Sequence, residues 1–189
     1  MKILKEIFSW MMNLFVAFAI AILINVFVFQ QTYVIGRSME PTLVENDTAI
    51  IIKLINTFDQ EPEYGDIVVI DSRVDSPRTF INDLSDSLKN NLITYFFLGK
   101  EMDGRYWIKR VIGKSGDVIE FKDGQVIRNG EILEEPYIKE KAYYANIKRV
   151  IVPENHVFVM GDNRNYSKDS RAIGPIPIDH IIGKYKFKY

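Results

Sequence analysis

A run of 22 residues without a single charged side chain, from Phe8 to Phe29, constrains this chain more than any other feature. One serine and two asparagines are its only polar interruptions. A helix of that length spans the roughly 30 Å hydrocarbon core of a bilayer. The run therefore predicts a transmembrane anchor over residues 8–29, with residues 1–7 on one side of the membrane.

Two other interpretations compete with an anchor. A cleaved signal peptide has a shorter apolar region, of roughly 7–15 residues, followed by a small-x-small site, whereas this run ends in V-F-V-F-Q-Q at residues 26–31. A buried helix of a soluble protein carries a polar face, which the run lacks. Lys2 and Lys5 precede the run and Arg37 follows it, a weak bias that places the amino terminus in the cytoplasm.

Composition leaves room for one anchored domain, residues 30–189, with a core of its own, since the chain has 189 residues of which 47% are hydrophobic. The formal net charge of −1 gives no basic field of the kind that nucleic-acid binding requires. The absence of cysteine excludes disulfides and thiol catalysis, and two histidines leave little for a metal site. We expect no nucleic acid, metal or cofactor.

Short β-branched runs bounded by turn residues predict a mainly β domain. The expected strands are residues 48–52, 66–70, 106–112, 116–121, 156–160 and 183–189. The dipeptides D-G at residues 123–124 and N-G at 129–130 are typical of tight hairpin turns.

Residues 73–104 interrupt this β pattern. D-S-P at residues 75–77 is typical of a helix start, and apolar residues then recur at helical spacing through Ile81, Leu84, Leu88 and Leu92. The segment predicts an inserted amphipathic helix, which either covers one end of the β core or makes a second contact with the membrane interface.

A candidate nucleophile, Ser38, lies in the stretch G-R-S-M-E-P-T at residues 36–42. Nine residues separate it from Phe29, and even a fully extended link of that length reaches only about 30 Å. Ser38 therefore lies near the membrane surface, where a substrate emerging from the same bilayer can reach it. A serine hydroxyl needs a neighbouring base to become a good nucleophile.

Two bases are candidates. His156 could complete a Ser-His-Asp arrangement with Asp162. Lys109 fits better, because strand alternation places it on one face with Trp107 and Val111, while Arg110 points to the other face. Apolar neighbours desolvate an amine and lower its pKa toward a value at which it can accept a proton.

A polar, turn-rich run, G-D-N-R-N-Y-S-K-D-S-R at residues 161–171, directly follows an apolar strand. Loops at strand ends commonly carry functional sites. Here the hydroxyls of Ser167 and Ser170 are candidates for orienting a lysine amine, and Asp169 with Arg171 can hold the shape of the loop.

Taken together, these motifs resemble those of the bacterial type I signal peptidases, the membrane-bound Ser-Lys peptidases that cleave signal peptides from exported proteins. The match is ordered and covers nearly the whole chain. After the apolar run come S-M-E-P-T at residues 38–42, G-D-I-V-V at 65–69, K-R-V-I-G at 109–113, G-D at 116–117 and the run at 161–171.

The resemblance implies Ser38 as the nucleophile, Lys109 as the general base and Ser167 as a residue that hydrogen-bonds and orients the lysine. It further implies that Asp169, Arg171 and Arg110 support the site, and that the backbone N–H of Ser38 helps to bind the oxyanion. The implied substrates are signal peptides cleaved after small-x-small sites, in a cell membrane and near the protein-export channel. A single anchor resembles the Gram-positive type, and a lysine base separates the chain from the endoplasmic-reticulum branch.

The chain departs from the family pattern at two positions. Gly36 stands where some relatives have a hydroxyl residue that helps to bind the oxyanion, and Ser115 stands where a proline is common. Two further interpretations remain: a non-catalytic, membrane-anchored homologue that binds precursors, and a self-cleaving repressor-type Ser-Lys protease. The anchor and the lack of a basic DNA-binding segment disfavour the second.

Overall fold

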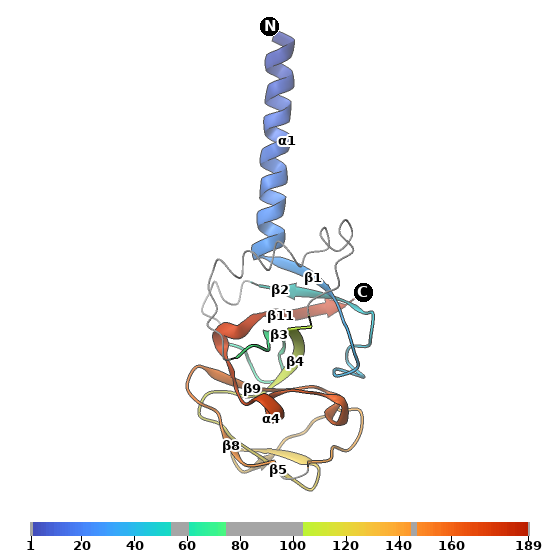
Figure 1. The fold of residues 1–189 in the computed structure, drawn as a ribbon, viewed down its shortest axis with the longest axis vertical. Coiled ribbons are helices and arrows are strands. Elements are labelled where there is room, and N and C mark those ends of the chain that lie inside the picture. Colours follow the sequence, from blue (N-terminus) through green and yellow to red (C-terminus); the bar gives the residue numbers. More distant parts are fainter. Residues whose placement is uncertain (1, 54–60, 75–103, 145–146, 189) are drawn as a thin grey trace.

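The computed structural model describes residues 2–53, 61–74, 104–144 and 147–188. A helix of 26 residues, α1 (Lys2–Phe27), projects away from a β-rich body (Figure 1). Among the described residues, no helix meets the combined length and hydropathy by which a bilayer-crossing helix is recognised. The expected inserted helix falls almost wholly on residues 75–103, which lie outside the described residues.

The apolar run is not helical to its end, contrary to the prediction. Phe29 begins β1 (Phe29–Tyr33) and pairs with Ile52, and the carbonyl oxygen of Val28 accepts a hydrogen bond from the backbone N–H of Lys53 at 3.0 Å. Pairing with a neighbouring strand therefore ends the helix at Phe27, two residues before the predicted boundary.

A sheet of seven strands, all paired antiparallel, lies next to α1 (Figure 1). Its order is β1-β2-β11-β3-β4-β9-β10. The remaining strands of this sheet are β2 (Thr48–Ile52), β3 (Ile67–Asp71), β4 (Tyr106–Gly113), β9 (His156–Met160), β10 (Ile176–Pro177) and β11 (Ile181–Lys188).

A second sheet lies at the end of the body far from α1 (Figure 1), with the order β7-β6-β5-β8. It consists of β5 (Val118–Lys122), β6 (Gln125–Arg128), β7 (Glu131–Ile132) and β8 (Val150–Ile151). Both expected hairpin turns are confirmed, because Asp123, Gly124, Asn129 and Gly130 all have positive φ angles.

The predicted strands are confirmed with small shifts of boundary, and the mainly β fold with them. The alternation expected at residues 183–189 is broken by an irregularity between Tyr185 and Phe187, after which Phe187 is 54% exposed. Short helices that the sequence did not predict occupy the loops near the carboxyl terminus: η2 (Arg164–Tyr166), α4 (Ser170–Ile173) and η3 (Ile178–His180).

Strand β3 is buried on both faces, which explains its unbroken apolar sequence. Ile67 and Val69 pack into one buried cluster, whereas Val68 and Ile70 pack into another on the opposite face. A third cluster joins the two sheets, since Ile112, Phe158 and Met160 of the larger sheet pack with Ile119 and Val126 of the smaller one. Strands β4 and β9 therefore run through the middle of the core.

Candidate active site

Lys109 is held in the core by β4, whose neighbours in the sheet are β3 and β9. Its side chain is 3% exposed, and its Nζ lies 5.8 Å from the centre of the Trp107 ring. Val111, two residues further along the same face, is also buried. The environment expected from strand alternation is confirmed: an amine among apolar side chains.

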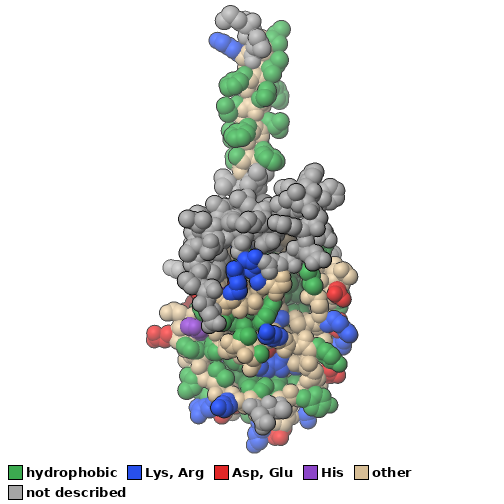
Figure 2. Space-filling view, in the orientation of Figure 1, with side chains coloured by type: hydrophobic (Ala, Val, Ile, Leu, Met, Phe, Trp, Pro, Cys, Tyr) green, Lys and Arg blue, Asp and Glu red, His purple; other side chains and the backbone are tan. Residues whose placement is uncertain are grey.

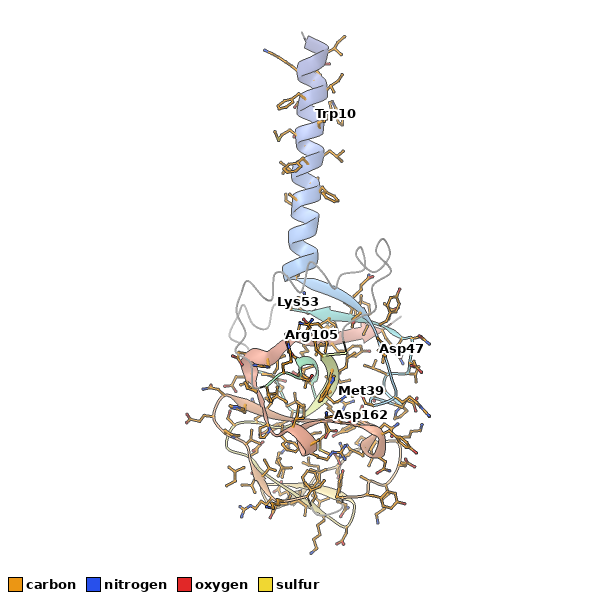
Figure 3. The ribbon with its side chains drawn as sticks, viewed as in Figure 1. Trp10, Met39, Asp47, Lys53, Arg105 and Asp162 are labelled. Atoms are coloured by element: carbon orange, nitrogen blue, oxygen red, sulfur yellow. The ribbon has the colours of Figure 1, made fainter. Side chains whose placement is uncertain are left out.

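Ser38 lies in the turn that follows β1, and two buried side chains fix this turn to the core. Met39 and Leu43 are almost completely buried in the first cluster, and the backbone N–H of Leu43 donates to the carbonyl oxygen of Met39 at 2.9 Å. The segment that follows β9 meets this turn, because the backbone N–H of Asn163 donates to the carbonyl oxygen of Ser38 at 3.0 Å. Figure 3 labels Met39 in the turn and Asp162 in that segment. The turn therefore cannot shift without disturbing the core.

These two segments place Ser38 and Lys109 in direct contact. The Nζ of Lys109 is 2.7 Å from the Oγ of Ser38, although 71 residues separate them in sequence. The amine also donates to the carbonyl oxygen of Ile108 at 3.0 Å. At such distances a proton can pass directly between the hydroxyl and the amine.

Burial lowers the pKa of Lys109 from its usual value near 10.5 to about 8. The carboxylates of Asp169 and Asp162 act in the opposite direction, because a nearby negative charge favours the ammonium form, and Arg171 lowers the pKa further. The direction matches the one expected from the sequence, and desolvation is its largest cause.

Asn163 holds the turn of Ser38 in place, a role that the sequence did not reveal. Its backbone N–H donates to the carbonyl oxygen of Ser38 at 3.0 Å, and its Nδ2 donates to the carbonyl oxygen of Arg37 at 3.0 Å. The residue is 1% exposed. Its place after Gly-Asp is equally typical of a turn, so local sequence alone gave no signal of a partner 126 residues away.

The carboxylate of Asp162 is hydrogen-bonded to Arg110 and Thr42 rather than to His156. Arg110 binds its carboxylate with two hydrogen bonds, of 2.8 and 2.7 Å, and Thr42 donates to it at 2.5 Å. His156 opens β9 and contacts the carbonyl oxygen of Glu154 through Nδ1. Asp162 is six positions after His156, about 20 Å in extended chain, so the described structure does not bring the two side chains of the Ser-His-Asp alternative together.

Asp169 and Arg171 form the expected ion pair, with two hydrogen bonds of 2.8 Å. The same carboxylate accepts the backbone N–H of Gly161 at 3.0 Å and caps α4 through the N–H of Arg171. Burial by itself would raise the pKa of Asp169, but the bonds from Arg171 and Gly161 outweigh it and lower the pKa. Asp169 therefore ties both ends of the loop together as a carboxylate.

Ser167 does not make the hydrogen bond to Lys109 that the resemblance implied. Its Oγ is buried, and no partner in the described part of the chain meets hydrogen-bond geometry, although the hydroxyl is close enough to Asp169 to help lower the pKa of that carboxyl. A Cβ on Gly161 would lie only 2.3 Å from this Oγ and 2.4 Å from the carbonyl oxygen of Ser38. The hydroxyl of Ser167 and the turn of Ser38 thus both pack directly against Gly161, where a larger residue would clash with them.

The departure at Gly36 has a backbone explanation. Its φ of +80° lies in the left-handed region that glycine adopts without strain, and an added Cβ would meet nothing within 4 Å. The turn geometry therefore favours glycine here, although there is space for a side chain. Ser115 similarly precedes Gly116, which has a φ of +86°, in a turn where proline would also fit.

A buried ion pair lies behind the loop. Arg164 and Glu135 form hydrogen bonds of 2.6 and 2.9 Å, with side chains 0% and 6% exposed. Arg164 also donates to the carbonyl oxygen of Gly161 at 2.9 Å and to the hydroxyl of Tyr144 at 3.0 Å. The guanidinium thus connects the loop that braces Ser38 to residues 135–144.

Comparison with known proteins matches this architecture to one family. The model of the signal peptidase family, peptidase S26, matches residues 7–189. A probable signal peptidase I-1 of Synechocystis sp. is 36% identical over 176 residues, which cover 93% of this chain and 79% of the relative. Signal peptidase IB of Staphylococcus aureus is 30% identical over 202 residues, covering 98% and 90%. A crystal structure of a signal peptidase I from Enterococcus faecalis V583 has a TM-score of 0.44 and 23% identity, and covers 67% of this chain and 97% of that one.

The chain therefore belongs to the signal peptidase family, peptidase S26. This membership confirms the predicted class, a serine endopeptidase of the type I signal peptidase kind, and disfavours the non-catalytic alternative.

Breaking the Arg164–Glu135 pair should destabilise the domain more than removing an exposed pair. Glu135→Leu or Arg164→Met alone leaves one charge buried without its partner, so we expect each to lower the free energy of unfolding by about 3–5 kcal/mol, and the double variant to cost less than the sum. Urea unfolding monitored by tryptophan fluorescence measures this.

The matched control is Arg149→Met. Arg149 pairs with Glu120 at 3.8 Å with both side chains well exposed, so its loss should change stability by at most about 1 kcal/mol. Strictly additive single-variant effects would contradict a coupled, buried pair.

Proposed function

We propose that Ser38 and Lys109 are the catalytic dyad of this peptidase, with Ser38 as nucleophile and Lys109 as general base. The 2.7 Å contact between the hydroxyl and a buried amine is the observation that carries the proposal. An amine with a pKa of about 8 is partly neutral at physiological pH, and the neutral form has a lone pair that accepts the hydroxyl proton.

In the proposed reaction, the Oγ of Ser38 attacks the carbonyl carbon of the scissile peptide bond while its proton passes to Lys109. The C–N bond then breaks, the ammonium of Lys109 protonates the leaving amine, and an acyl-enzyme remains. Water, deprotonated by the same lysine, attacks the ester; the C–Oγ bond breaks, the ammonium of Lys109 returns the proton to Ser38, and the carboxylate product is released. Donation of one N–H to Ile108 at 3.0 Å directs the lone pair of the neutral amine toward Ser38.

The backbone N–H of Ser38 is the proposed oxyanion donor. It makes no hydrogen bond to any residue that the structure describes, so it is available to a developing negative charge. Gly36 contributes no side-chain donor, and a second donor is assigned to no residue here. Asn163 holds the carbonyl groups of Arg37 and Ser38 at 3.0 Å, which fixes the direction of this N–H.

Two ion pairs and one serine support the dyad in this proposal. Arg110 neutralises Asp162, and Arg171 neutralises Asp169, so that neither buried carboxylate stabilises the ammonium form of Lys109 at full strength. Ser167 orients the lysine when the amine moves during the reaction. Its buried Oγ, which has no hydrogen-bond partner among the described residues and lies against Gly161 together with the carbonyl oxygen of Ser38, supports this role.

We further propose that α1 anchors the enzyme in the cell membrane. Its 26 residues extend about 39 Å at 1.5 Å per residue, and residues 8–29 carry no charge. Large apolar side chains cover the described part of the helix (Figure 2), and Phe8, Trp10, Leu14 and Phe15 are each more than 60% exposed. A bilayer is the environment in which such a surface is stable.

The proposed topology has residues 1–7 in the cytoplasm, one span over residues 8–29, and the peptidase domain of residues 30–189 outside. Signal peptides of exported precursors are the proposed substrates, cleaved after small-x-small sites near the export channel. Because Ser38 is nine positions after Phe29, the nucleophile stays within about 30 Å of the membrane.

Removing either member of the dyad should abolish cleavage. Ser38→Ala and Lys109→Ala should each lower kcat/KM for a precursor by at least about 10³-fold, because the reaction loses its nucleophile or its base. Cleavage by the purified chain in detergent is the measurement. Ser115→Ala and Lys148→Ala, which change residues at the exposed surface, should retain activity within about twofold. Near-full activity of Ser38→Ala or Lys109→Ala would contradict the dyad.

The rate should follow deprotonation of Lys109. Only the neutral amine can accept the proton, so activity is present above about pH 8 and falls about tenfold per pH unit below it. The profile of kcat/KM against pH measures this, and His156→Gln should leave it unchanged. An inflection near 6.5, the reference pKa of histidine, would contradict a lysine base.

A further inference from the structure

An ionic cluster of three residues lies beside the proposed nucleophile. Glu40 accepts hydrogen bonds from the guanidinium of Arg37, at 2.9 and 3.3 Å, and from the Nζ of Lys139, at 2.5 Å. Arg37 and Glu40 flank Ser38 in the same turn, whereas Lys139 comes from a segment 99 residues away. We call these three residues the rim cluster.

The outer surface of the rim cluster is positive. The side chain of Glu40 is 13% exposed, whereas those of Arg37 and Lys139 are 64% and 40% exposed. One carboxylate therefore lies beneath two cations. Hydrogen bonds from Arg37, and next from Lys139, lower the pKa of Glu40 to about 2, so the cluster keeps one surplus positive charge throughout the neutral range.

The rim cluster lies next to Ser38, the proposed nucleophile. The carbonyl oxygen of Arg37 is held by Asn163 at 3.0 Å, and the Cα atoms of Arg37 and Ser38 are separated by about 3.8 Å, as in any trans peptide. The neighbouring acid Glu140 bonds to Asn165 at 3.2 Å and is not part of the cluster. The exposed Lys168 lies 5.7 Å from the ring of Trp107, the same ring that Lys109 approaches at 5.8 Å, and adds a further cation.

We propose that the rim cluster makes this enzyme prefer substrates with an acidic side chain among the first residues after the scissile bond. This inference rests on the proposed function. A small-x-small site constrains only residues before the scissile bond. The residues after the bond can therefore vary in charge. A positive rim attracts a carboxylate there and repels an ammonium. Because the Debye length is about 8 Å at physiological salt and these cations are exposed, the effect is modest.

The test uses three peptide substrates that differ at the second residue after the cleaved bond, which is Asp, Asn or Lys. For the full chain in detergent at about 0.02 M salt, we expect kcat/KM to fall in the order Asp, Asn, Lys, with a ratio of about fivefold or more between Asp and Lys. Raising the salt concentration to about 0.5 M should reduce this ratio toward one.

Two substitutions change the cluster charge in opposite directions. Lys139→Gln removes the surplus charge and should bring the Asp-to-Lys ratio to within about twofold of unity. Glu40→Gln exposes two unopposed cations and should raise the ratio above that of the unsubstituted enzyme. Lys148→Gln, an exposed lysine in another segment, is the control and should leave the ratio as it is.

An equal ratio in the unsubstituted enzyme, Lys139→Gln and Glu40→Gln would overturn the inference, as would a preference for the Lys peptide. Failure of the proposed function is distinguishable, because the Asn peptide would then survive incubation with the unsubstituted enzyme, or would be cleaved equally well by Ser38→Ala.

Discussion

The rest of the site depends on one physical constraint, the burial of a lysine amine against a serine hydroxyl. Removing an ammonium group from water is costly, and a protein lowers that cost by letting the group lose its proton. Strand β4 provides the burial, because it lies between β3 and β9 and presents Lys109 between Trp107 and Val111. Burial of the amine, which leaves Lys109 only 3% exposed, thus lowers its pKa to about 8, as the proposed role of general base requires.

The carboxylates around the Lys109 amine are paired with arginines, so their effect on its pKa does not cancel the effect of desolvation. Asp162 and Asp169 would each raise the pKa of Lys109, yet each carboxylate is bound by an arginine, Arg110 or Arg171, at 2.7–2.8 Å. The same carboxylates bind neighbouring segments, since Asp169 accepts a hydrogen bond from the backbone N–H of Gly161 and Asp162 accepts one from the side-chain hydroxyl of Thr42. The loop at residues 161–171 therefore carries carboxylates whose charge is neutralised by arginines and which also hold neighbouring segments in position.

Much of this could be predicted from the sequence, because strand alternation and turn chemistry are local. The face shared by Trp107, Lys109 and Val111 follows from the period of two in a strand. The D-G and N-G turns could be predicted because these residue types adopt the positive φ angles that tight hairpin turns need, and the structure has those angles. Contacts over long separations could not be predicted locally. These contacts are the bonds from Asn163, the Arg164–Glu135 pair and the burial of the Ser167 Oγ, which has no hydrogen-bond partner among the described residues. They depend on where β4, β9 and the turn of Ser38 meet. The apolar run also concealed the start of β1, since an apolar sequence fits a helix and a strand equally well.

The ionisation of Lys109 is the central claim, and NMR of the labelled lysine side chain tests it most directly. The full chain in detergent, with its lysines isotope-labelled and the Lys109 signal assigned by comparison with Lys109→Ala, would be titrated across the alkaline range. The buried amine should titrate with a midpoint near pH 8, well below the reference value of about 10.4 for a lysine in a model peptide. A Lys109 midpoint at that reference value would contradict the account.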